Sequence, residues 1–186
     1  MYGKEAIVGF RVGEKVVYPN HGVGVIEKIS TQQIDGELSK FYLLRLNLTN
    51  SIVMVPISNA TEVGLRHLIS LADCEYLLKN LAENFSNPPS DWKDRYREFV
   101  NMMRTGDIYN VARVLKTLTY LNQLKPLSFR EKRMLERARY LVISEIATVC
   151  KMTESQVVVL VDQALKKACY KHHRGSGMRS AAVAGR

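Results

Sequence analysis

The first third of the chain alternates apolar and polar residues with a period close to two, which is typical of short β-strands. Gly22 and Gly24 stand close together at the second predicted strand and indicate a sharp bend. The turn Asp35-Gly36 joins the next two strands. The predicted strands are residues 15–18, 23–29, 33–34, 41–46 and 52–56. Because no helical interval separates them, a small closed or nearly closed β-barrel would satisfy their edges economically.

From about residue 71 the apolar period changes to about 3.6, which predicts helices. Ser128 followed by Glu131 forms a capping box, and Thr153 can cap the last helix. The predicted helices are residues 71–81, 90–104, 107–122, 128–149 and 153–168. The fourth has an apolar stripe that is broken only by Glu145. We therefore predict an α+β chain, a small β-barrel followed by an all-α helical bundle.

The pattern divides the chain into four segments. Residues 1–9 lack periodicity and are predicted to be a flexible lead-in. Residues 10–69 form the barrel, and residues 70–169 form the bundle. Residues 170–186 contain Gly, Ser, Ala and basic residues without an apolar core, so we expect a disordered basic tail.

Composition excludes several classes. With 186 residues, of which 46% are hydrophobic, the chain can bury a core and fits one or two small domains. It has no run of 18 apolar residues and no signal-peptide pattern, so we expect a cytoplasmic protein without a membrane contact. Cys74, Cys150 and Cys169 are far apart, which supports neither a disulfide framework nor a zinc site.

The net charge of +9 is unevenly distributed. Residues 1–70 carry 7 Lys or Arg against 6 Asp or Glu, and residues 71–150 carry 13 against 10. Residues 151–186 carry 7 against 2. A basic second half suggests a polyanionic partner for that half, although a merely soluble cationic surface would have the same composition.

Catalytic motifs are missing from the sequence. It has no P-loop, no G-x-G-x-x-G, no G-x-S-x-G and no H-E-x-x-H. Cys169, His172 and His173 could bind a metal, but a structural or tail role is favoured because further ligands are missing. We therefore expect no enzyme, no cofactor and no metal site.

The only tryptophan, Trp92, lies where a helix is predicted to start. Pro88-Pro89 ends the preceding segment, Ser90 can cap the new helix, and Asp91 favours the positive end of its dipole. A large side chain in the first turn can project past the helix end.

The surroundings of Trp92 allow two interpretations. Lys93, Arg95 and Arg97 place positive charge around it, which suits a probe for nucleic acid. The spacing of Trp92, Tyr96, Phe99 and Met103 is equally typical of a stripe that faces a core. The pattern alone leaves both interpretations open.

Residues 10–26, FRVGEKVVYPNHGVGVI, resemble the N-terminal module of the bacterial CarD/CdnL transcription regulators. Further landmarks follow in family order: Val55-Pro56, Val63–Arg66, Trp92–Arg97, Thr105–Asp107 and Leu127–Leu135. The resemblance covers about residues 10–168. The first module is also similar to that of transcription-repair coupling factors, and the helical half with its tryptophan favours the CdnL type.

The resemblance implies a Tudor-like or SH3-like barrel that docks on the β subunit of RNA polymerase. It implies that the helical domain contacts the minor groove of promoter DNA at the upstream edge of the bubble, where Trp92 acts as a wedge that stabilises the open complex. Separately, we expect the protein to be a monomer. The implied DNA-facing residues are Trp92, Lys93, Arg95, Tyr96 and Arg97. The implied polymerase-facing residues are Gln32, Ile34, Leu44, Met54 and Pro56.

Three positions depart from the family pattern. Some relatives have arginine where Gln32 and Met54 stand, so docking on polymerase would be more apolar here; Asp94 occupies a position that is often basic. Two alternatives are a repair-associated adaptor that binds polymerase without a DNA wedge, and a Tudor- or KOW-like binder of RNA or the ribosome.

Overall fold

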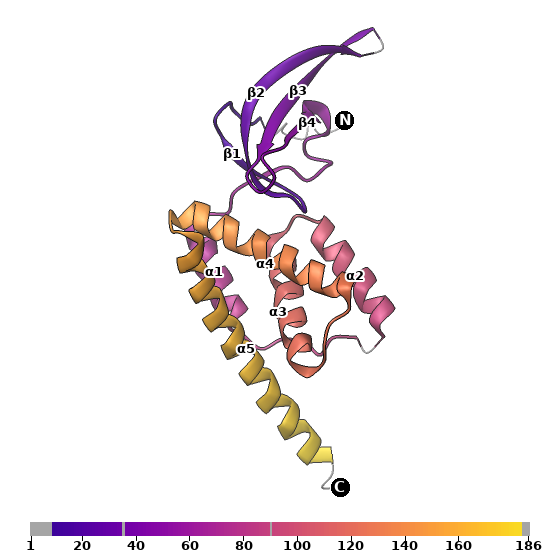
Figure 1. Cartoon of the computed structure of the whole chain (residues 1–186), viewed down its shortest axis with the longest axis vertical. Coiled ribbons are helices and arrows are strands. Elements are labelled where there is room, and N and C mark those ends of the chain that lie inside the picture. The colour runs from indigo at the N-terminus through magenta and orange to yellow at the C-terminus, as the bar shows by residue number, and fades with distance from the viewer. Residues whose placement is uncertain (1–8, 35, 90, 184–186) are drawn as a thin grey trace, which may run out of the picture. The chain divides into compact units, whose positions relative to one another are not determined.

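The computed structural model describes residues 9–34, 36–89 and 91–183. The chain divides into two compact units, Met1–Leu68 and Ile69–Arg186 (Figure 1). Strands make up the first unit and helices the second, which confirms the predicted α+β class. The predicted lead-in lies outside the described residues except for Gly9.

The first unit is a five-stranded antiparallel sheet in the order β4-β3-β2-β1-β5. Its strands are β1 (Lys15–Tyr18), β2 (Gly22–Ile34), β3 (Glu37–Leu46), β4 (Ile52–Pro56) and β5 (Arg66–His67), with a short 3-10 helix, η1 (Ile57–Asn59), after β4. Two predicted strands are a single one, because β2 continues through a bulge between Ile26 and Lys28.

The class and the antiparallel strands are as predicted, but closure of the sheet into a barrel is not detected in the described residues. β4 and β5 are the two edges of an open sheet, and no strand pairing joins them in the part of the chain that the structure describes. β5 has only two residues and pairs with β1 alone. The long β2–β3 hairpin gives the largest share of the pairing.

One face of the sheet covers a small core. The backbone N–H of Phe10 donates to the hydroxyl of Tyr42 at 3.1 Å, and the two rings pack edge to face. The buried cluster consists of Phe10, Val16, Ile26, Tyr42, Leu44, Leu46, Val55, Ala60 and Leu65. Gly24 allows β3 to approach, since a Cβ there would lie 2.7 Å from the carbonyl oxygen of Arg45.

The second unit contains five helices in the described residues. They are α1 (Leu71–Leu81), α2 (Trp92–Arg104), α3 (Ile108–Leu124), α4 (Phe129–Cys150) and α5 (Glu154–Val183). Two of the predicted caps are present: Ser128 and Glu131 form a capping box, and the Thr153 hydroxyl accepts from the N–H of Gln156 at 3.3 Å.

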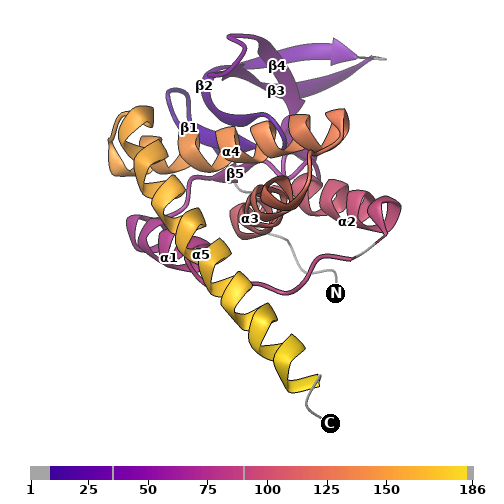
Figure 2. The same cartoon turned by 60° about the horizontal axis from the view of Figure 1, so that its bottom comes forward.

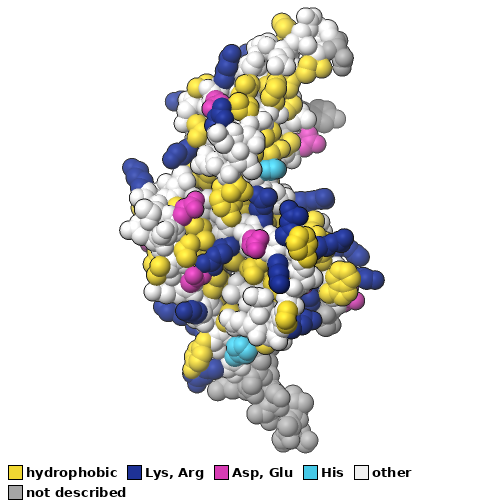
Figure 3. Space-filling view, viewed as in Figure 1, with side chains coloured by type: hydrophobic (Ala, Val, Ile, Leu, Met, Phe, Trp, Pro, Cys, Tyr) yellow, Lys and Arg dark blue, Asp and Glu magenta, His cyan; other side chains and the backbone are white. Residues whose placement is uncertain are grey.

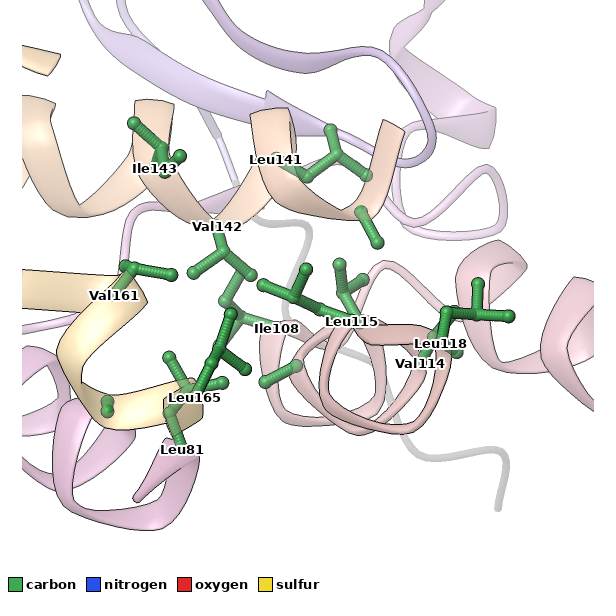
Figure 4. Packing of buried hydrophobic residues seen from close by; sticks show 14 of the residues in the cluster. Leu81, Ile108, Val114, Leu115, Leu118, Leu141, Val142, Ile143, Val161 and Leu165 are labelled. Carbon is green, nitrogen blue, oxygen red and sulfur yellow. The ribbon is translucent and has the colours of Figure 1, made fainter. Parts of the chain in front are cut away.

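The helical core is built around α3, whose buried residues are mostly apolar but include Lys116. Side chains from α1, α3, α4 and α5 point toward one another in Figure 4. Among them are Leu81, Leu115, Val142 and Leu165, which are at most 2% exposed. This packing confirms the apolar stripes that the 3.6-residue period indicates.

Glu145 explains the break in the apolar stripe of α4. It is 1% exposed, and its carboxylate accepts a hydrogen bond from the backbone N–H of Ile69 at 3.1 Å. A buried carboxylate is stable only where such donors satisfy it. Glu145 therefore holds the segment that leads into α1 against α4.

The sequence predicted a disordered basic tail from residue 170, whereas the described part of α5 continues as a helix to Val183. A long-range contact accompanies this extension. His172 is buried and stacks on the ring of Phe85, which follows α1, with 4.2 Å between ring centroids. Figure 2 shows α5 running along α1 and then beyond the other helices.

No described helix is long and apolar enough to cross a membrane. Within the same residues, no cluster of three His, Cys, Asp or Glu side chains could hold a metal ion. The three cysteines are free thiols. Burial, followed by interaction with Cys150, raises the pKa of Cys74 to about 12, so this thiol stays protonated at neutral pH.

We expect Gly24→Ala to destabilise the sheet unit by about 2 kcal/mol, because the added Cβ would force β2 and β3 apart. Urea unfolding of the full chain, followed by near-ultraviolet circular dichroism, measures the change. Gly9→Ala is the matched control, since nothing lies within 4 Å of its Cβ position. Equal stability of the two variants would contradict the close approach.

Candidate functional site

The start of α2 is fixed by Asp91. Its side chain accepts hydrogen bonds from the backbone N–H groups of Lys93, at 2.6 Å, and Asp94, at 3.3 Å. Asp91 is therefore the N-cap, where the sequence predicted Ser90, which lies outside the described residues. Trp92 is the first residue of the helix.

Trp92 protrudes from the helical unit and is 54% exposed. The face of α2 that is buried consists of Arg95, Phe99 and Met103, spaced four residues apart. This stripe is offset from the predicted one, so Trp92 falls outside it and Tyr96 is half-buried at its edge. The core interpretation of Trp92 is wrong.

Arg95 differs from the DNA-facing role that the resemblance implied. It is 4% exposed. Its guanidinium donates to the carbonyl oxygen of Pro89 and to the carboxylate of Glu131, both at 2.9 Å. A side chain in this position braces the helix and does not reach a nucleic acid.

Glu131 holds two helix starts together. Besides pairing with Arg95, its carboxylate accepts hydrogen bonds from the N–H and the hydroxyl of Ser128, the N-cap of α4. Burial alone would raise the pKa of Glu131, but the hydrogen bonds from Arg95 and Ser128 together lower it. The carboxylate therefore stays charged and couples α2 to α4.

Cationic side chains surround this exposed tip. Lys93 and Arg97 are exposed, and Arg97 lies 3.9 Å from Asp94, which reduces its positive field. Exposed cations at the start of α4 add to them: Arg130, Lys132 and Arg133. Figure 3 shows Lys and Arg side chains gathered over the α2 and α4 part of the helical unit.

Sequence reasoning missed Phe129, which is 73% exposed. Phe129 follows the N-cap Ser128 as Trp92 follows the N-cap Asp91, so each helix presents an aromatic ring at its first residue. The guanidinium carbon of Arg133 lies 5.7 Å from the centre of the Phe129 ring. An aromatic directly after a cap residue was the signal that could have found it.

The sheet unit brings four of the five predicted polymerase-facing residues to one face. Cross-strand partners share a face of a sheet. Gln32 pairs with Ser39 and Ile34 with Glu37, while Met54 pairs with Leu43 and Pro56 with Phe41. Since residues 37, 39, 41 and 43 alternate along β3, these positions share one face.

Leu44 lies on the opposite face and is fully buried in the core of the sheet unit. Strand alternation explains the difference, because Leu44 points the opposite way from Leu43. It cannot contact a partner while the unit stays folded. Ile34 and Met54 are nearly half exposed and remain available.

These two surfaces are typical of a protein that binds macromolecules. Residues 10–69 match the CarD-like/TRCF RID domain, and residues 76–162 match the C-terminal domain of CarD. The fold and the matches define a non-enzymatic transcription factor with an RNA polymerase-interacting domain. The chain belongs to the CarD/CdnL family.

The relatives agree with this family. The "Putative transcription factor YdeB" of Bacillus subtilis (strain 168) is 30% identical over 148 residues, which are 80% of this chain and 97% of the relative. A solved structure described as "CdnLNt from Myxoccoccus xanthus" is 36% identical and covers 37% of this chain and 96% of its own, with a TM-score of 0.30.

We expect Arg95→Ala to destabilise the helical unit by about 3 kcal/mol, because it leaves the carboxylate of Glu131 without its cation. Arg97→Ala, the matched control on the same helix, should cost less than about 0.5 kcal/mol, since its ion pair is exposed. Urea unfolding at pH 7 measures both values.

The cost of Arg95→Ala should also depend on pH. The pKa of Glu131 is lower in the folded state than its usual value of 4.5, so the pair stabilises the fold above that pH. This stabilisation is lost as the pH falls through the folded pKa. An equal cost at pH 7 and pH 3 would show that the pair is not the cause.

Proposed function

We propose that this protein stabilises the open promoter complex, with its sheet unit on the β subunit of RNA polymerase and its α2 tip at the upstream edge of the bubble. The observation that carries the proposal is the exposed Trp92 at a capped helix start that an ion pair braces. Trp92, Lys93, Tyr96 and Arg97 are the proposed DNA-facing residues. Arg95 supports these residues by bracing the start of α2.

An exposed indole favours parted strands for a physical reason. A wedge must spend a few kcal/mol to unstack an intact base step, but it gains stacking where the step is already open. Trp92 would therefore bind an open promoter more tightly than a closed one. Because a ligand shifts a population only through such differential affinity, this preference raises the fraction of open complex.

Sequence specificity is expected to be weak. Lys93 and Arg97 are flexible, exposed cations that suit phosphates, and no bidentate reader of base edges is evident near Trp92 in the described residues. Recruitment to promoters would then come from polymerase. Two weak contacts in one chain increase the overall affinity through effective concentration.

The proposed polymerase-facing surface is the outer face of β2, β3 and β4 at Gln32, Ile34, Met54 and Pro56. Two of these side chains, Ile34 and Met54, are apolar and about half exposed, which suits the centre of a protein interface. None of the four carries a charge, so this docking should depend little on salt. Such a partner implies the cytoplasm as the place of action.

We expect Trp92→Ala to shorten the lifetime of the open complex by about 5- to 30-fold, which corresponds to about 1–2 kcal/mol. The lifetime is measured on a linear promoter after addition of a competitor, with polymerase at saturating concentrations of each variant.

Tyr76→Ala is the control for this experiment, because Tyr76 is a similarly exposed aromatic on α1. It should leave the lifetime unchanged. A normal lifetime with Trp92→Ala, together with normal polymerase binding, would eliminate the wedge and favour the repair-associated adaptor.

Met54→Asp should weaken binding to the polymerase β subunit by about tenfold or more, because it buries a charge in an apolar contact. Co-purification of the full chain with polymerase, followed by titration, measures the loss.

Val12→Asp is the matched control, since Val12 is an exposed apolar residue of the same unit that lies before β1. Polymerase binding by Met54→Asp that equals the control would place the interface elsewhere. Co-purification with ribosomes instead of polymerase would favour the RNA-binding alternative.

A further inference from the structure

The C-terminal half of α5 lies beyond the residues that match the CarD C-terminal domain, which end at 162. The helix itself continues to Val183, and Figure 2 shows that its end extends past the other helices. The proposed contacts of Trp92 and of the sheet unit use no residue of this segment. The exposed side chains of this segment differ from those of the two proposed contact surfaces.

One face of this half-helix is anchored to the bundle. The inward positions follow a helical period and are buried: Val161, Ala164, Leu165, Ala168, Cys169 and His172. The ring of His172 also meets Tyr120 in a T-shaped contact with 4.6 Å between ring centroids, and its Nδ1 lies 3.0 Å from Oδ1 of Asn84. These contacts fix which residues of α5 face outward.

The outward positions form a second stripe, here named the α5 stripe. It consists of Lys166, Lys167, Tyr170, His173 and Arg174, all of them exposed, although the His173 ring also lies against Tyr120 with 5.1 Å between ring centroids. Residues three or four positions apart are neighbours on a helix, so Tyr170 has a cation or a histidine on each side along the axis. Tyr170 is 63% exposed, and the guanidinium carbon of Arg174 lies 5.7 Å from its ring centre.

The α5 stripe carries positive charge that its own helix does not balance. From residue 163 to residue 186 the sequence contains six Lys or Arg and no Asp or Glu. Asp162, the last acidic residue of α5, is paired with Arg139, and Glu83 is paired with Lys171 beside the stripe. Within the described side chains, Lys166, Lys167 and Arg174 have no ion pair.

The cations of the α5 stripe are spread along the helix axis. Lys167 and Arg174 are seven residues apart, which is about 10.5 Å along a helix. Positive charges spread over such a length can contact several phosphates of a duplex, which carries one negative charge per about 1.7 Å of its axis. The α5 stripe consists of basic, histidine and tyrosine side chains, and the exposed aliphatic residues of α5, Val159 and Leu160, precede it. The centre of a protein interface is usually apolar. Duplex DNA is therefore favoured over an acidic protein.

We propose that the α5 stripe is a second DNA-binding surface, which contacts duplex phosphates through Lys166, Lys167 and Arg174 and places the Tyr170 ring against the backbone. The contact is independent of base sequence, because phosphates carry no base identity. It does not depend on insertion of Trp92. By adding phosphate contacts to the same chain, it raises the effective concentration of the α2 tip near DNA.

Titration of the full chain against a labelled random-sequence duplex, by fluorescence anisotropy at several salt concentrations, tests this surface. The combined variant Lys166→Gln, Lys167→Gln and Arg174→Gln should bind about tenfold or more weakly at low salt. Its salt dependence should be less steep by about 0.9 log units per log unit of salt for each lost phosphate contact. Tyr170→Ala should weaken binding without changing the slope.

A charge-matched control is the combined variant Lys15→Gln, Lys28→Gln and Lys40→Gln, three exposed cations of the sheet unit. It should keep the affinity and slope of the unaltered chain. Equal losses in both triple variants would reduce the effect to net charge and overturn the proposal. So would an unchanged slope in the α5 variant, provided that circular dichroism shows its helices intact.

Two further measurements distinguish the α5 stripe from the α2 tip and from a site for acidic protein. Trp92→Ala should retain the α5-dependent slope, so failure of the wedge would leave the α5 contact standing. Poly-glutamate serves as the acidic-protein probe. If the α5 variant loses binding to poly-glutamate while duplex binding stays normal, the surface binds acidic protein and the proposal is wrong.

Discussion

The ion pair between Arg95 and Glu131 is the interaction on which the exposed tip of the helical unit depends. Both side chains are almost inaccessible, and Glu131 also belongs to the capping box of α4. The starts of α2 and α4 therefore cannot shift independently. Trp92 and Phe129, the first residues of these helices, are displayed from one braced base, which keeps large rings exposed without loosening the fold.

In the sheet unit the corresponding constraint is strand register. One face of β3 supplies Tyr42, Leu44 and Leu46 to the core, and the other faces outward. The bulge between Ile26 and Lys28 decides which face the far half of β2 joins, because one extra residue reverses the alternation. This one bulge therefore determines which residues of β2 lie in the core and which lie on the proposed contact surface.

The sequence predicts most elements because their signals are local. The capping residues Ser128 and Thr153 mark helix starts, and α1 has the predicted bounds. The continuation of α5 beyond residue 168 is not predictable in this way, since its buried residue His172 contacts Phe85 and Tyr120, which are distant in sequence. Barrel closure likewise depends on whether the edge strands β4 and β5 meet in space, which no short pattern encodes.

Two site residues were misplaced although the sequence held the signal. Arg95 has the same four-residue spacing from Phe99 that Phe99 has from Met103, so periodicity places it on the buried face. Its charge suggested exposure, whereas its spacing indicated burial. Burial is possible because Glu131, from another helix, pairs with its guanidinium. Leu44 falls on the inward side by simple alternation. The roles of Lys93, Tyr96 and Arg97 stay predictions.

The acidic residues at the starts of α2 and α4 affect which part of a nucleic acid these helix starts can bind. A helix start normally attracts phosphate, because its unpaired N–H groups and dipole favour an anion. Here Asp91 already occupies that position on α2, and Glu131 places a carboxylate at the start of α4. These carboxylates neutralise the positive ends of the α2 and α4 dipoles, which disfavours phosphate binding there. The flat faces of the Trp92 and Phe129 rings remain accessible, and such faces favour stacking of exposed nucleobases over binding of phosphate.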